Sequence, residues 1–107
     1  MTDKLKNTIL NYLNSEWGDM TPYFTPECEY YIFYFLNNEK IIAYNWATKE
    51  VHIRYSIVWS FLINFFKLPD HEIHNLMFEW LNDRYNIKTP KIFILNDDQF
   101  SWIKKLP

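Results

Sequence analysis

The chain has 107 residues, of which 49% are hydrophobic and 22% charged, and its net charge at pH 7 is −2. This size and balance are typical of one globular domain and exclude a disordered chain. Both charge signs are spread along the sequence, so we expect neither a duplex DNA binder, which needs a basic stripe, nor a DNA mimic, which needs a dense acidic face.

Gly18 is the only glycine in the chain. Phosphate-cradling loops, dinucleotide fingerprints and nucleophile elbows all need glycine where the backbone approaches a ligand or turns sharply. The sequence therefore excludes these enzyme classes. Aromatic residues make up 21% of the chain, which points instead to packing and to contact surfaces.

The cellular compartment is indicated by cysteine usage and by apolar runs. Cys28 is the only cysteine, which rules out an intramolecular disulfide and favours a reducing compartment. The first residues lack the apolar core of a signal peptide, and no apolar run approaches the ~20 residues of a membrane span. We expect a cytoplasmic protein.

The N-terminal part of the chain predicts a helix over 3–16. Leu5, Ile9 and Leu13 recur at helical spacing, and Thr2 or Asp3 can cap the start. Gly18 follows at the point where a helix end favours a residue with positive φ. Residues 19–28 then read as an extended connection.

Three strands are predicted next, over 30–36, 40–46 and 51–55, because these runs are rich in aromatic and β-branched residues. Asn37-Asn38 and Thr48-Lys49 are the expected two-residue turns. With both turns at this length, Tyr34 pairs with Ile41, Tyr31 with Tyr44, and Tyr44 with Ile53. The predicted core face then holds Tyr31, Phe33, Phe35, Ile42, Tyr44, Trp46, Val51, Ile53 and Tyr55. The opposite face holds Tyr30, Ile32, Tyr34, Leu36, Ile41, Ala43, Asn45, His52 and Arg54.

The remaining sequence predicts helices over 57–67 and 70–85 and a fourth strand over 91–95. It also predicts a short helix over 98–105, which Asn96 or Asp97 can cap at its start. The first of these helices is apolar nearly all round, which predicts burial on most sides. We expect Trp59 and Trp80 to pack between it and the following helix. The fold class is α+β, a single domain over 1–107 with an antiparallel sheet of three to four strands.

Residues 51–87 carry the series Val51, Arg54-Tyr55, Trp59-Ser60-Phe61, Phe66, Leu68, Glu72-Ile73, Trp80-Leu81 and Tyr85-Asn86-Ile87. This series resembles a family of small uncharacterised phage-type proteins of low-GC genomes. The resemblance implies a phage-like accessory protein and brings no functional residues with it.

Three sets of residues could carry chemistry, and none has the arrangement that catalysis or metal binding requires. His71 and His74 lie three apart beside Glu72, without a third ligand and without the H-E-x-x-H spacing. Cys28 and His52 fall on segments that the sheet should separate. The pairs Glu27/Glu29 and Asp97/Asp98 are not placed in an apolar cleft. We predict no catalytic residue, no metal and no cofactor.

The second face of the predicted sheet is the strongest functional candidate. It is aromatic and amphipathic, and the sequence leaves open whether a helix covers it. If it is uncovered, it exceeds the apolar patch that a soluble monomer exposes. Tyrosine and arginine are enriched at protein interfaces. We therefore expect a non-catalytic protein-binding accessory protein, directed at a host or defence protein or at a second copy of itself. An aromatic sheet face that stacks single-stranded nucleic acid is the alternative. The predicted contact residues are Tyr30, Tyr34, His52, Arg54 and Trp102.

Overall fold

The computed structural model describes residues 2–106, and its contacts divide the chain into two compact units. Unit 1 comprises the chain through Asp19 together with Ser56–Thr89, and unit 2 comprises Met20–Tyr55 together with the chain from Pro90 onward. The expectation of a single domain stays a prediction.

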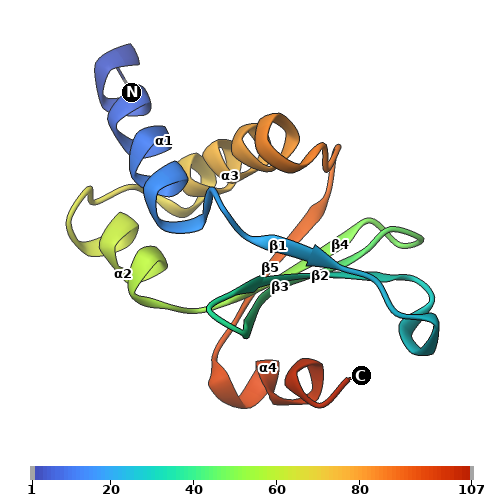
Figure 1. Cartoon of the computed structure of the whole chain (residues 1–107). Helices are drawn as coiled ribbons and strands as arrows, with labels where there is room; N and C mark the ends of the chain where they lie inside the picture. Colours follow the sequence, from blue (N-terminus) through green and yellow to red (C-terminus); the bar gives the residue numbers. More distant parts are fainter. Residues whose placement is uncertain (1, 107) are drawn as a thin grey trace. The chain divides into compact units, whose positions relative to one another are not determined.

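Unit 1 is built from three helices, α1 (Asp3–Trp17), α2 (Ile57–Asn64) and α3 (Asp70–Tyr85) (Figure 1). Thr2 caps α1 by accepting a hydrogen bond of 3.2 Å from the Leu5 backbone amide. α3 ends at Asn86, which adopts the left-handed conformation with φ 56°. The helices predicted over 3–16 and 70–85 are confirmed.

Gly18 ends α1 with a φ of −67°, so the expected positive φ is wrong. The reason for glycine at this position is space. A Cβ atom here would lie 2.2 Å from the Asn14 carbonyl oxygen. The Gly18 carbonyl also accepts a hydrogen bond of 2.6 Å from Nε of Arg84 in α3.

The predicted helix over 57–67 stops at Asn64, and its burial is less complete than expected. Phe65 is 66% exposed and belongs to a cluster of rings with Tyr12, Phe61 and Phe66. Trp59 packs towards α3, with its ring centroid 6.3 Å from that of His74. The ring centroid of Trp80 lies 6.2 Å from that of Trp17 in α1, a contact that the prediction did not include.

Unit 2 is a five-stranded sheet in the order β1-β2-β3-β4-β5, with α4 (Asp97–Lys104) along one face (Figure 1). The strands are β1 (Thr21–Tyr23), β2 (Tyr31–Leu36), β3 (Glu39–Asn45), β4 (Glu50–Arg54) and β5 (Lys91–Leu95). A short 3-10 helix, η1, covers Pro26–Cys28. The α+β class and the four predicted strands are confirmed. β1 lies within the segment predicted to be an extended connection, and β5 pairs parallel to β4.

The register of the sheet differs from the prediction because β3 contains a β-bulge. The Asn37-Asn38 turn forms as expected, with φ values of 51° and 65°, and Phe35 pairs with Lys40. The next residue, Tyr34, pairs with Ile42, which leaves Ile41 as an extra residue of β3. Tyr31 therefore pairs with Asn45 instead of Tyr44.

This shift by one residue moves the side chains of residues 31–34 to the other face relative to residues 42–45 of β3. Phe33 now shares a face with Ala43 and His52, while Tyr34 shares the other with Ile42 and Ile53. The predicted grouping of the two faces is wrong for this reason. The second connection is also longer than expected, since Asn45 pairs with Glu50 and Tyr44 with Val51. Because this second shift is two residues, the side chains of β3 and β4 still share faces as predicted.

The α4 face of the sheet carries an apolar cluster, formed by Cys28, Phe33, Ala43, Phe100 and Ile103. Asn96 begins α4 with a capping box, in which its side chain accepts from the Gln99 amide and Gln99 accepts from the Asn96 amide. Trp46 and Tyr55, which were expected in the core, are each 44% exposed. Their position at the strand ends explains this correction, because they lie beyond the paired residues of β3 and β4.

Candidate interaction surface

Alternation along β4 places His52 and Arg54 on the face of the sheet that α4 partly covers. The His52 ring stacks on Phe93 of β5, with centroids 5.2 Å apart and planes at 19°. It also meets Trp102 of α4 edge to face at 5.9 Å. Phe93 and Trp102 are 42% and 45% exposed. We call His52, Phe93 and Trp102 the aromatic patch.

His52 is the polar member of the aromatic patch, and its environment favours the neutral ring. Burial lowers the pKa of His52 below its usual value, and the nearby Glu50 carboxylate opposes this shift. Nε2 lies 3.9 Å from Glu50. Nδ1 is buried and has no hydrogen-bond partner within residues 2–106. A buried nitrogen without a partner costs free energy. The contacts with Phe93 and Trp102 hold the ring in place despite this cost.

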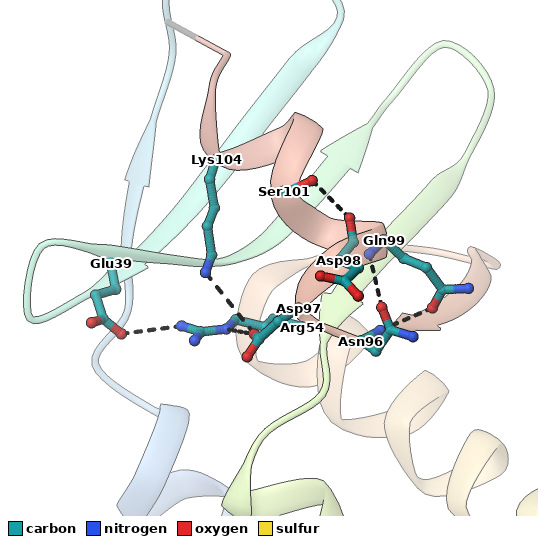
Figure 2. Close-up of polar contacts among 8 residues, drawn as sticks. All are labelled: Glu39, Arg54, Asn96, Asp97, Asp98, Gln99, Ser101 and Lys104. Atoms are coloured by element: carbon teal, nitrogen blue, oxygen red, sulfur yellow. Dashed lines mark hydrogen bonds and ion pairs between the residues drawn. The ribbon is translucent and has the colours of Figure 1, made fainter.

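Arg54 is held in a fixed orientation by two carboxylates from different elements (Figure 2). Nε donates to Asp97 Oδ1 at 2.9 Å, and Nη1 donates to Glu39 Oε2 at 3.3 Å. Nζ of Lys104 lies 4.0 Å from the same Asp97 oxygen. The hydrogen bond and charge of Arg54 lower the pKa of Asp97. We call Glu39, Arg54, Asp97 and Lys104 the Arg54 cluster.

A hollow of about 300 Å³ lies beside the Arg54 cluster. Its lining residues are Phe35, Asn38, Glu39, Lys40, Arg54 and Lys104. Lys40 is already engaged, because its Nζ donates to the Ile103 and Leu106 carbonyls and lies over the Phe33 ring. The charges that line the hollow are of both signs and are largely paired. Such a hollow suits a polar group with both donors and acceptors better than a bare anion.

The five predicted contact residues do not share one face. Tyr34 is 4% exposed and lies on the face opposite His52 and Arg54. Tyr30 precedes β2 and is 49% exposed, with its ring 5.5 Å from that of Trp46. The expected grouping is wrong because the bulge at Ile41 places the side chain of Tyr34 on the opposite face relative to β4. The structure does bring Trp102 of α4 against His52. Arg54 lies on the same strand as His52.

Sequence reasoning missed Phe93, Glu39, Asp97 and Lys104. For Phe93 a signal was present, because strand alternation separates it from Ile92 and Ile94 and places it with Lys91 and Leu95. The capping role assigned to Asn96 or Asp97 also places an acidic residue at the start of α4. Its pairing with Arg54 depends on how α4 crosses the sheet, and no local pattern encodes that.

Cys28 is buried in the apolar cluster under α4, and His74 packs against Trp59 in unit 1. Within residues 2–106, no three histidine, cysteine or acidic side chains are grouped as a metal ion would require. None of the helices in this range is long and apolar enough to cross a bilayer.

Comparison of the chain with protein-family models, with curated proteins and with solved structures found no significant match.

Proposed function

We propose that this protein is a non-catalytic, cytoplasmic protein-binding domain that contacts its partner through the aromatic patch and the adjoining Arg54 cluster. The observation that carries the proposal is the pair of exposed rings, Phe93 and Trp102, packed around His52. Large aromatic residues and arginine supply most of the binding energy at protein interfaces.

The fixed geometry of the surface supports the same proposal. Trp102 and Phe93 are held against the His52 ring, and Arg54 is oriented by Glu39 and Asp97. Side chains that are ordered before binding lose less conformational entropy when the partner arrives. The neutral His52 ring adds no charge that the interface would have to desolvate.

Single-stranded nucleic acid remains the alternative ligand, since exposed rings can stack bases. Basic and acidic residues are equal in number within unit 2, and Arg54 is already paired with two carboxylates. Nucleic-acid binding needs an excess of free cations along the path of the phosphates. The charge balance therefore favours a protein partner.

The resemblance of residues 51–87 to small phage-type proteins supports an accessory role directed at a host or defence protein.

Affinity capture from the cell that produces the protein, followed by mass spectrometry, would identify the partner, and titration calorimetry would then measure its Kd. We expect Trp102→Ala to raise this Kd by tenfold or more, as for a central interface residue. Trp46→Ala is the matched control, because Trp46 is equally exposed in unit 2 but lies outside the surface.

Equal affinities for wild type and for both Trp102→Ala and Arg54→Ala would refute this surface. Titration with a labelled oligothymidylate at increasing salt tests the alternative. A measurable affinity that falls steeply with salt would favour nucleic-acid binding instead.

A further inference from the structure

The two edges of the unit 2 sheet differ in how they are protected from pairing with another strand. β1 forms one edge, has only three residues and contains Pro22, which cannot donate to a further strand. β5 forms the other edge. From Ile92 to Leu95 it has no proline and no charge. An unprotected edge of this kind is a template for strand addition.

The hydrogen bonds to β4 show which groups of β5 point outward. The Lys91 amide donates to the Lys49 carbonyl at 2.7 Å, and the Leu95 carbonyl accepts from the Tyr55 amide at 2.7 Å. Successive residues of a strand direct their backbone groups to opposite sides. The amides and carbonyls of Lys91, Phe93 and Leu95 therefore point towards β4. The amides and carbonyls of Ile92 and Ile94 therefore face the open edge.

From this edge we infer that the partner of the aromatic patch is a second copy of the chain, joined through antiparallel pairing of the two β5 strands. The inference rests on the proposed function and names its partner. A twofold axis at Phe93 places Ile92 of each copy opposite Ile94 of the other, and each such pair exchanges two hydrogen bonds. All four outward groups of each β5 strand are then satisfied.

Charge complementarity selects the antiparallel direction. Lys91 lies at the start of β5, and Asp97 and Asp98 follow its end. Antiparallel pairing brings Lys91 of each copy towards the acidic N-terminus of α4 in the other. Parallel pairing would instead set Lys91 beside Lys91 and the acidic pair beside its own copy, which is unfavourable.

In this arrangement the exposed rings of Phe93 from the two copies contact each other. Phe93 meets Phe93 of the second copy as a non-hydrogen-bonded pair, for which the Cα atoms lie about 4.5 Å apart and the side chains touch. The ring is 42% exposed in the single chain and lies on the same face as Trp102. Pairing therefore covers the aromatic patch from the side of β5.

Sedimentation equilibrium of the full chain tests the inference. We expect the mass to rise from that of one chain to that of two as concentration increases. Phe93→Lys should weaken this association at least tenfold, because it sets two like charges opposite each other. Tyr23→Lys is the matched control, since Tyr23 is similarly exposed on the β1 edge.

Cysteine cross-linking tests the register independently of stability. Phe93→Cys should form an intermolecular disulfide under mild oxidation, because a Cα separation of about 4.5 Å lies within the disulfide range. Lys91→Cys should not, since its symmetry mate lies about 13 Å away along the strands. The native Cys28 is buried and supplies the background rate.

The possible outcomes separate this inference from the proposed function. A single-chain mass at every concentration, without a Phe93→Cys cross-link, would overturn the dimer. If such a monomer still captured a foreign protein in a Trp102-dependent manner, the proposed function would stand alone. Equal cross-linking of Phe93→Cys and Lys91→Cys would reject the twofold register.

Discussion

Nζ of Lys40 donates a hydrogen bond of 3.0 Å to the Ile103 carbonyl, which ties the start of β3 to the end of α4. The same ammonium group also donates to the Leu106 carbonyl and lies 4.4 Å from the centre of the Phe33 ring. A helix leaves its last carbonyls without intrahelical donors, and a cation there also interacts favourably with the helix dipole. Lys40 thus holds α4, and with it Trp102, against the sheet.

Lys40→Met should lower the free energy of unfolding by about 1–2 kcal/mol, because two carbonyls lose a charged donor. Methionine keeps most of the apolar stem, so packing against Phe33 changes little. Urea denaturation followed by tryptophan fluorescence measures the change. Lys105→Met removes an exposed cation from the end of the same helix and should cost less stability, because only its interaction with the helix dipole is lost. Equal losses in the two variants would contradict the role assigned to Lys40.

Trp80 should be the most sensitive tryptophan in unit 1. It is 2% exposed, and its Nε1 donates a hydrogen bond of 2.8 Å to Asn14 Oδ1. Trp80→Phe removes this donor and part of the ring, and we expect a loss of about 2 kcal/mol in unfolding free energy.

A double-mutant cycle with Asn14→Ala isolates the hydrogen bond between Trp80 and Asn14. We expect a coupling energy of about 1 kcal/mol between the two substitutions. Strictly additive losses would show that the contribution of Trp80 to the free energy of unfolding comes from packing of its ring and not from the hydrogen bond.

Local patterns predicted the elements of this fold well. The helical spacing of apolar residues predicted α1 and α3 close to their observed bounds. The capping residues Thr2 and Asn96 marked the starts of α1 and α4. The Asn37-Asn38 turn was also predicted, because asparagine tolerates the positive φ that both positions adopt. These features depend on interactions between residues that are close in sequence.

The candidate surface could not be predicted in full, because it depends on one extra residue and on contacts distant in sequence. Nothing in the run Lys40-Ile41-Ile42 marks Ile41 as a bulge. That residue decides whether Tyr34 lies with His52 or on the opposite face. The contact between His52 and Trp102 joins residues that only the path of α4 brings together.

The backbone conformation of the Asn37-Asn38 turn can be tested by substitution of Asn38. Asn38 has a φ of 65°, which costs a β-branched residue about 1–2 kcal/mol more than it costs asparagine or glycine. Asn38→Val should therefore lower the melting temperature, whereas Asn38→Gly should preserve or raise it. Differential scanning calorimetry of both variants measures the effect. A valine variant as stable as the glycine variant would mean that the turn does not require positive φ.

His52 should make the stability of unit 2 depend on pH. Burial between Phe93 and Trp102 lowers the pKa of its imidazole below the ordinary 6.5, despite the charge of Glu50. The unfolded chain therefore binds a proton more readily than the folded protein. Stability is highest above pH 6.5 and falls as pH drops from there towards the lowered folded pKa.

His52→Phe removes the titrating group while keeping an aromatic ring between Phe93 and Trp102. It also removes the buried Nδ1 that lacks a partner, so unfolding free energy at pH 7 should rise by about 1 kcal/mol. Between pH 7 and pH 5 the variant should lose less stability than wild type, as measured by urea denaturation at each pH. Parallel pH profiles would mean that His52 is as readily protonated in the folded protein as in the unfolded chain.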